Sequence, residues 1–300
     1  MRYTNKHNIP LAIYNALVRD DYVLKGDISA TGLTKSVRQV QLAKRFDKLI
    51  VVDASTRLWS LLGRAVHNIV EQHGPDEYVM EETLKAEVLG WIVAGTPDVW
   101  IPSLRDLDDY KVTAVAALSK AKEEWVTQLN YYRWLIETQT GVLVNNMTIH
   151  AILRDHMIWN LFKDKNYPLI PFKSRPIEKL SLDKVEAMIY ANVKRHQEGE
   201  GFDDAAIPNC TPAELWQDPD KWAVLKKGGK RAIPGGVCDT QDAAEDLVKL
   251  KESAGKASYT IDYRPSQAKR CHYCDPRCVC GQYKVMLKEG MIQKLPDGLN

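Results

Sequence analysis

The chain has 300 residues, which exceeds the usual length of one domain and predicts one large domain or two small ones. Apolar residues make up 45% and charged residues 27%, a balance that excludes a disordered chain, a fibrous repeat and a disulfide-dense miniprotein. The formal net charge of +2 neither indicates nor excludes a nucleic-acid partner, because a local basic patch matters more than the total.

No apolar run reaches the roughly 18 residues that a membrane-spanning helix needs, and the N-terminal segment lacks the apolar stretch of a secretory signal. We therefore expect a cytoplasmic protein with no membrane partner. In a reducing compartment, clustered cysteines favour a metal site over disulfides.

Hydrophobic periodicity and turn residues predict alternating helices and strands. In chain order, the expected elements are a helical region over 9–48, a helix from Asp53 to about Gln72, strands over 78–89, 90–100 and 107–112, a helix over 118–138, a strand over 142–153 and a helix over 180–195. Gly74-Pro75 ends the second helical segment, and Gly90 bends the strand region. The predicted fold class is α/β, with a mixed (α+β) sheet flanked by helices.

The character of the sequence changes after residue 200, where Gly, Pro, Asp and Lys become frequent. A hairpin with a basic turn over 222–232, a short helix near 241–253 and a strand near 257–263 are expected there. We predict a core with an N-terminal helical region over residues 1–200 and a cysteine-rich C-terminal appendage over 201–300.

Two aspartates and a lysine form the most informative pattern in the first part. Asp98 ends one expected strand, and Asp109 and Lys111 lie on the next, two residues apart and so on the same face. Carboxylates gathered at one sheet edge suit Mg²⁺ or Mn²⁺, and the Lys111 ammonium could stabilise charge developing on a phosphoryl group. Such residues are also common in solvated loops, but the strongly apolar flanks make unpaired carboxylates costly here.

Further polar residues occur in a fixed order around this pattern. His67 lies on the preceding helix, and Gln128 and Tyr132 share a face of the following helix. Each of these residues alone is equally compatible with a structural role.

Four features thus occur in order along the chain: a helical His, Thr96-Pro97-Asp98, Asp109-Tyr110-Lys111, and a helix with Gln128 and Tyr132. This ordered set resembles the PD-(D/E)XK nuclease superfamily, in particular its RecB-like exonuclease branch. The resemblance covers about residues 27–155. It implies a mixed sheet flanked by helices and metal-dependent hydrolysis of DNA phosphodiesters by water.

The resemblance also implies roles for individual residues. His67, Asp98, Asp109 and the backbone carbonyl of Tyr110 would bind the metal, with Asp98, Asp109 and Lys111 as the catalytic set. Gln128 and Tyr132 would position the DNA backbone. A further acid is expected upstream of Asp98, for which Glu82 is the weak first choice, with Glu81 and Glu87 equally available.

The six cysteines include a dense C-terminal cluster of Cys271, Cys274, Cys278 and Cys280. Such a cluster predicts a metal site, and four thiolates can hold either zinc or a [4Fe–4S] cluster. The two possibilities stay open on spacing alone.

The C-x₂-C-x₅-C spacing of Cys271, Cys274 and Cys280 resembles the terminal cysteine triplet of iron–sulfur nucleases of the RecB-like branch. In those families the fourth cysteine precedes the nuclease core, whereas no cysteine occurs here before Cys210. The segment from Cys210 to Trp216 resembles the C-terminal part of nucleases encoded by tailed phages. This resemblance implies Cys210, Cys271, Cys274 and Cys280 as ligands of a structural iron–sulfur cluster or zinc ion, with Cys278 as the rival fourth ligand.

The expected hairpin concentrates positive charge that could contact DNA phosphates. Its basic residues are Lys221, Lys226, Lys227, Lys230 and Arg231, with Trp216 and Trp222 nearby. A solvated turn is an equally good interpretation. The chain has no helicase P-loop, so any unwinding motor must be a separate partner.

The sequence therefore favours a metal-dependent DNase, an exonuclease of recombination or end processing that is phage-encoded and acts in the host cytoplasm. DNA is the expected partner, with a recombinase, single-strand-binding protein or helicase as further candidates. The alternatives are a catalytically silent DNA-binding or assembly protein with a nuclease fold, and a zinc-bearing interaction module.

Overall fold

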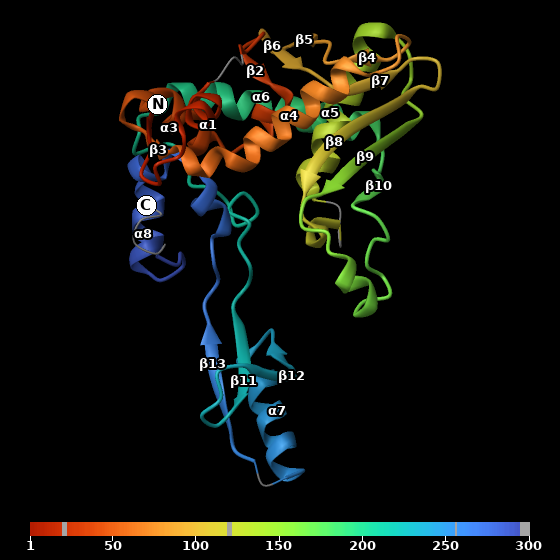
Figure 1. Cartoon of the computed structure of the whole chain (residues 1–300). Helices are drawn as coiled ribbons and strands as arrows, with labels where there is room; N and C mark the ends of the chain where they lie inside the picture. The colour runs from red at the N-terminus through yellow and green to blue at the C-terminus, as the bar shows by residue number, and fades with distance from the viewer. Residues whose placement is uncertain (20–22, 119–121, 256, 295–300) are drawn as a thin grey trace. The chain divides into compact units, whose positions relative to one another are not determined.

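The computed structural model describes residues 1–19, 23–118, 122–255 and 257–294 (Figure 1). The α-helices are α1 (Leu11–Val18), α2 (Ala30–Leu33), α3 (Val37–Arg45), α4 (Leu58–Gln72), α5 (Glu123–Thr140), α6 (Leu182–Gly201), α7 (Gln241–Ser253) and α8 (Gly281–Lys288). The strands are β1 (Arg2–Thr4), β2 (Ile28–Ser29), β3 (Val51–Asp53), β4 (Val79–Met80), β5 (Leu84–Val88), β6 (Trp91–Gly95), β7 (Val99–Ile101), β8 (Asp106–Thr113), β9 (Asn146–Leu153), β10 (Phe172–Pro176), β11 (Lys221–Lys226), β12 (Ala232–Cys238) and β13 (Tyr259–Arg264).

The chain divides into two compact units. One comprises residues 3–40 and 52–207, and the other comprises residues 1–2, 41–51 and 208–300. The second unit is therefore built from three separate stretches of sequence. None of the helices in the described part of the chain is long and apolar enough to cross a membrane.

A mixed five-stranded sheet in the order β10-β9-β8-β7-β4 organises the larger unit. β8 and β9 are parallel, whereas β7 is antiparallel to β8 and β10 is antiparallel to β9. A three-stranded sheet in the order β2-β6-β5 lies in the same unit. The expectation of a mixed α/β architecture with flanking helices is confirmed.

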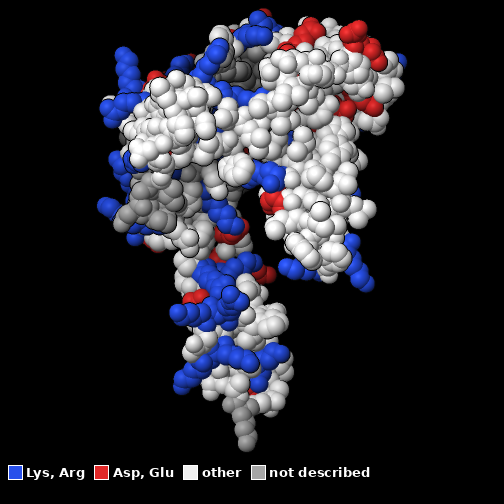
Figure 2. All heavy atoms as spheres, viewed as in Figure 1, with Lys and Arg blue, Asp and Glu red and all other residues white. Residues whose placement is uncertain are grey.

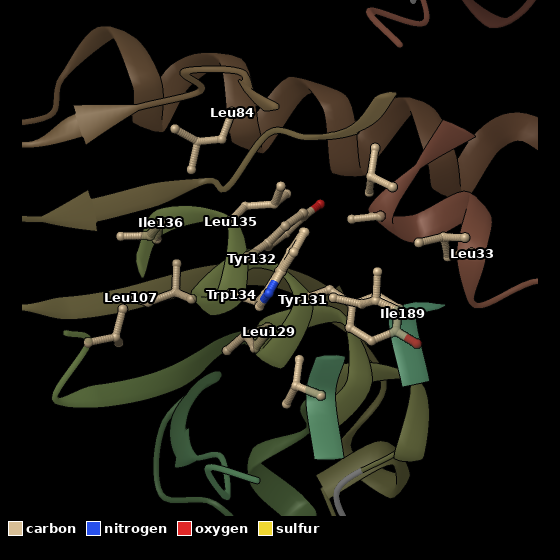
Figure 3. Close-up of a cluster of buried hydrophobic side chains, with 14 of the residues drawn as sticks. Leu33, Leu84, Leu107, Leu129, Tyr131, Tyr132, Trp134, Leu135, Ile136 and Ile189 are labelled. Atoms are coloured by element: carbon tan, nitrogen blue, oxygen red, sulfur yellow. The ribbon is translucent and has the colours of Figure 1, made fainter. Parts of the chain in front are cut away.

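Helix α5 supplies much of the core of this unit. Its buried side chains include Leu129, Tyr132 and Leu135, which pack with Leu33, Leu107 and Ile189 from other elements (Figure 3). Strand β6 and helix α5 lie in close contact at Gly95, where an added Cβ would lie 2.4 Å from Leu135 Cδ1 and 3.1 Å from the Tyr132 ring. A glycine at the end of β6 therefore allows α5 to pack directly against the strand.

The local predictions differ from the structure mainly at the N-terminus. The region 9–48 is divided among α1, β2, α2 and α3 instead of continuing as helix. The turn at Gly90 is confirmed: Leu89 and Gly90 have φ values of 50° and 80° and join β5 to β6, as a two-residue hairpin with positive φ at both positions requires. The helix expected over 241–253 is α7, whereas strand β10 was not predicted.

The smaller unit contains the antiparallel sheet β12-β11-β13, with α7 in contact with all three strands. The predicted basic hairpin is observed as β11 and β12. A separate apolar cluster joins Leu215, Ala268, Cys271, Met286 and Ile292. The cysteine-bearing segment therefore has a small hydrophobic core of its own.

Candidate metal and phosphoryl-transfer site

Strand β8 places one carboxylate entirely inside the protein. The Asp109 side chain is 0% exposed, and Lys111, two residues further on the same face, is 23% exposed. Lys111 Nζ donates a hydrogen bond to Asp109 Oδ1 at 2.7 Å and lies 2.5 Å from Oδ2. The ammonium thus neutralises the charge of the buried carboxylate, while its own side chain remains partly exposed to solvent.

The pairing of β7 with β8 brings Asp98 beside Asp109. Val99 is the register partner of Asp108, so Asp98 follows opposite Asp109 in this antiparallel pair. Asp98 Oδ2 accepts a hydrogen bond from the Tyr110 backbone N–H at 2.7 Å. The two aspartates expected at one sheet edge are therefore together.

Helix α4 brings His67 to the same place. His67 Nε2 lies 3.1 Å from the Tyr110 carbonyl oxygen, and Nδ1 lies 3.5 Å from Asp98 Oδ1. The same Nδ1 is 3.6 Å from Glu81 Oε1. One imidazole thus lies beside Asp98 and the Tyr110 carbonyl, as the sequence predicts, and beside a carboxylate that the sequence left undecided.

That further acid is Glu81, whereas the weakly predicted Glu82 is exposed and the alternative Glu87 is exposed on β5. Glu81 has a φ of 51°, a left-handed conformation that non-glycine residues rarely adopt. Its N–H donates to the Asp98 carbonyl at 3.3 Å. The turn that aims Glu81 at His67 has no signature in the residue types, so the sequence could not distinguish Glu81 from its neighbour.

The expected DNA-positioning residues lie next to the buried aspartate. Gln128 Nε2 on α5 is 3.4 Å from Asp109 Oδ1 and donates to the Tyr132 hydroxyl at 3.1 Å. Burial raises the pKa of Tyr132, which keeps its hydroxyl protonated.

The donor set fits a divalent cation. One ligand atom each from His67, Glu81 and Asp98 lies within 4.8 Å of the others. Imidazole and carboxylate ligands suit Mn²⁺, and carboxylates suit Mg²⁺. With Asp109 and Lys111 included, three carboxylates face one ammonium, so a dication would neutralise the excess negative charge.

The electrostatics of the metal-free site reflect this excess of carboxylates. Burial, together with the Asp109 charge, raises the pKa of Asp98 to about 7. Burial also raises the pKa of Asp109, although Lys111 opposes that shift. The contact with Glu81 raises the pKa of His67. Protons therefore bind in this region more tightly than they would in the unfolded chain.

The second group of potential ligands lies in the smaller unit. Burial raises the pKa of Cys274 to about 12, and the neighbouring Cys271, Cys280 and Cys210 thiols add to the shift. The four cysteines that the resemblance implies therefore lie in one region of the smaller unit, whereas Cys278 is exposed. Among the described residues, only His67, Glu81 and Asp98 form a set of ligand atoms that all lie within 4.8 Å of one another. Four thiols are a donor set that fits zinc or an iron–sulfur cluster.

Side chains tie the distant Cys210 to this cluster. Gln282, on α8, accepts a hydrogen bond from the Cys210 N–H at 2.8 Å and donates to its carbonyl oxygen at 2.9 Å. The rival, Cys278, belongs to a short 3₁₀ helix, Asp275–Val279, between Cys274 and Cys280. The sixth cysteine, Cys238, lies on β12.

The basic residues of the hairpin are on the surface of the smaller unit. Lys226, Lys227, Lys230 and Arg231 are exposed at the turn between β11 and β12. Figure 2 shows Lys and Arg side chains gathered over the part of the chain that contains β11, β12 and β13. Trp222 packs on Tyr263 with ring centroids 5.4 Å apart, and the Arg270 guanidinium lies 5.0 Å from the centroid of the Trp216 ring.

Comparisons with known proteins give a distant structural likeness. No family model matches the sequence, and no curated protein matches it. Among solved structures, SSO0001 has a TM-score of 0.42 at 15% identity, covering 61% of this chain and 83% of that one. A phage-related exonuclease from Haemophilus somnus 129PT has a TM-score of 0.29 at 15% identity, covering 54% and 70%. At these scores, neither likeness carries an argument about activity.

Glu81 and Glu82 form a natural pair of variants for the metal site. Glu81→Gln removes a carboxylate ligand and should weaken Mn²⁺ binding at least about tenfold, whereas Glu82→Gln should leave it unchanged. Isothermal titration calorimetry on the metal-free protein measures both affinities. Equal affinities for the two variants would remove Glu81 from the ligand set.

The raised pKa of Asp98 predicts the pH dependence of stability in the metal-free protein. A carboxyl group whose pKa is higher in the folded state stabilises that state at low pH, and the contribution disappears as the pH rises from about 4 to about 7. Asp98→Asn should therefore raise the free energy of unfolding at pH 8 by up to about 4 kcal/mol, and much less at pH 4. Urea unfolding in EDTA tests this, with the exposed Asp76→Asn as control. A gain in Asp98→Asn that does not vary with pH would contradict the explanation.

Proposed function

We propose that this chain is a metal-dependent deoxyribonuclease of the PD-(D/E)XK superfamily, in its RecB-like exonuclease branch. The observation that carries the proposal is the convergence of His67, Glu81 and Asp98 beside the Asp109–Lys111 pair. The order of these residues along the chain supports the same assignment. A non-enzymatic DNA-binding protein has no need of a partly exposed lysine beside a set of metal ligands.

The proposed reaction is the hydrolysis of a DNA phosphodiester by water. His67, Glu81, Asp98 and the Tyr110 carbonyl would hold Mg²⁺ or Mn²⁺, with Asp109 completing the set. The ion would supply water activation and neutralisation of phosphate charge. The water oxygen would bond to phosphorus as the bond to the leaving sugar oxygen breaks. The attacking water would release one proton to solvent, and the leaving oxygen would take up one proton from solvent.

The remaining polar residues have separate tasks in this proposal. Lys111 would orient the attacking water and stabilise the charge that develops on the phosphoryl oxygens. Gln128 and Tyr132 would donate hydrogen bonds to the DNA backbone, for which the raised pKa of Tyr132 keeps its proton in place. Asp109 fixes Lys111 by their direct contact at 2.7 Å.

We further propose that Cys210, Cys271, Cys274 and Cys280 hold a structural [4Fe–4S] cluster, with zinc as the alternative. The influence of Cys210, Cys271 and Cys280 on the pKa of Cys274, and the exposure of Cys278, support this set. Such a group would stabilise residues that bury few apolar side chains of their own. We assign this cysteine-rich region as an appendage to the nuclease core.

The proposed biological setting is phage-encoded recombination or DNA end processing in the host cytoplasm. DNA is the proposed substrate, and the exposed cations of the β11–β12 turn are candidate phosphate contacts. A recombinase, a single-strand-binding protein or a helicase would act as a separate partner.

Lys111 provides the direct test of the activity. Lys111→Ala should reduce hydrolysis of linear DNA at least about 100-fold, because the charge that stabilises the transition state is lost, with little effect on DNA binding. End-labelled linear, nicked and circular DNA, incubated with Mg²⁺ or Mn²⁺, measures the loss and the preference for ends. Lys85→Ala, an exposed lysine on β5, is the control. An unchanged rate in Lys111→Ala would refute the site, and no cleavage by the wild type would favour a silent DNA-binding protein.

The cysteine assignment predicts which thiols retain the metal. Cys210→Ser should lower the bound iron or zinc and the melting temperature, because one of four ligands is lost. Cys278→Ser is the matched control and should retain the metal. Elemental analysis and absorption spectroscopy of anaerobically purified protein measure both. Loss of metal in Cys278→Ser with retention in Cys210→Ser would reverse the choice of the fourth ligand.

A further inference from the structure

The segment between β9 and β10, residues 154–171, exposes large apolar side chains to solvent. Trp159 is 72% exposed, Phe162 79% and Leu169 82%. The other exposed members are Met157, Ile158 and Ile170. Several large exposed apolar side chains gathered in one short segment mark a candidate interaction site.

Internal contacts hold this segment in shape. His156 Nε2 lies 2.7 Å from the Pro168 carbonyl oxygen, and the Met157 N–H donates to the Tyr167 hydroxyl at 3.0 Å. The Leu153 N–H donates to the Pro171 carbonyl at 2.9 Å, which closes the segment at its base. The exposed rings of Trp159 and Phe162, with centroids 5.9 Å apart, therefore project from a braced structure.

The base of the segment adjoins the proposed catalytic site. The Arg154 N–H donates to the Thr113 carbonyl at 3.0 Å, and Thr113 lies two residues after Lys111 on β8. At about 3.3 Å per residue, the separation along the strand is about 7 Å. The base of the segment therefore lies within a few residues of the Asp109–Lys111 pair along the same strand.

Helix α4 also contacts the base of this segment. The Arg154 guanidinium lies 4.3 Å from the centroid of the Trp59 ring, near the start of the helix that carries His67. Eight residues of helix separate Trp59 from His67, which is about 12 Å. The base of the segment is thus in contact with β8 and α4, two of the elements that carry the proposed site.

The charges of the segment favour nucleic acid over protein. Lys163 and Lys165, both exposed, follow Phe162 in the sequence, whereas Asp155 and Asp164 each accept a hydrogen bond from a backbone N–H. Lysine is depleted at protein–protein interfaces, but lysine beside exposed aromatic rings is typical of sites for single-stranded DNA. Figure 2 shows Lys and Arg side chains at the edge of a largely uncharged surface at the end of this part of the molecule.

We propose that residues 154–171 bind the unpaired end of a DNA strand, with bases stacked on Trp159 and Phe162 and phosphates near Lys163 and Lys165. The adjoining phosphodiester would then lie at Asp109 and Lys111. The inference rests on the proposed nuclease function and adds to it a preference for single-stranded or frayed ends.

The test measures DNA binding without cleavage. Fluorescence anisotropy with a labelled oligothymidylate of about 12 nucleotides, in EDTA, gives the affinity independently of the metal site. Trp159→Ala combined with Phe162→Ala should weaken binding at least about tenfold, because two stacking surfaces are lost. Leu104→Ala, an exposed apolar residue elsewhere in the same unit, should change it less than about twofold. Trp159→Phe should retain most of the affinity.

Hydrolysis of bis(4-nitrophenyl) phosphate with Mn²⁺ separates the two proposals. If the ester is cleaved but the double variant binds the oligonucleotide as the wild type does, the stacking proposal is overturned and the nuclease stands. If the ester is not cleaved but binding depends on the two rings, the stacking proposal stands and the nuclease fails. A double variant that changes only its oligomeric state by sedimentation, with unchanged DNA affinity, would assign the segment to a second protein copy and overturn the proposal.

Discussion

The burial of Asp109 is the constraint on which the rest of the site depends. A carboxylate with no solvent exposure has a large desolvation cost, which is several kcal/mol in real proteins unless a partner compensates it. Lys111 is that partner, and its position two residues along the same strand follows from the pleat. Strands β7 and β9, which pair with β8 on either side, prevent the strand from rotating to expose Asp109. The ammonium is therefore fixed in place by the architecture of the sheet.

The site as a whole is locally unfavourable without a cation. Glu81 adopts a left-handed backbone conformation, and its carboxylate joins two others in a largely enclosed space. Strained backbone and like charges in proximity are typical of functional sites, where the surrounding fold provides the stability. Here that stability comes from the packing of α5 against Gly95 and the sheets around it.

The sequence was sufficient to predict the parts of this architecture that local patterns determine. Asp98 and Asp109 converge because a tight pair of strands leaves few alternatives, and α7 begins directly after Thr240, whose side chain caps the helix. Glu81 could not be distinguished from Glu82, because a positive φ at a non-glycine residue is imposed by tertiary contacts. Strand β10 is largely exposed and contains Lys, Ser and Arg, so no alternating apolar pattern marks it. The exposed rings at Trp159 and Phe162 would ordinarily be assigned to the core.

The smaller unit combines residues from near both ends of the chain, which affects the order of folding during synthesis. The Met1 ammonium contacts Asp47 at 2.6 Å and the Arg2 N–H donates to Ile50, yet the remainder of this unit begins only at Pro208. Residues 41–51 therefore leave the ribosome long before the stretch that completes their unit. All residues of the larger unit precede Pro208, so that unit can fold before residues 41–51 acquire their C-terminal partners. Contacts so distant in sequence form slowly, because a long stretch of chain must close before they can be made.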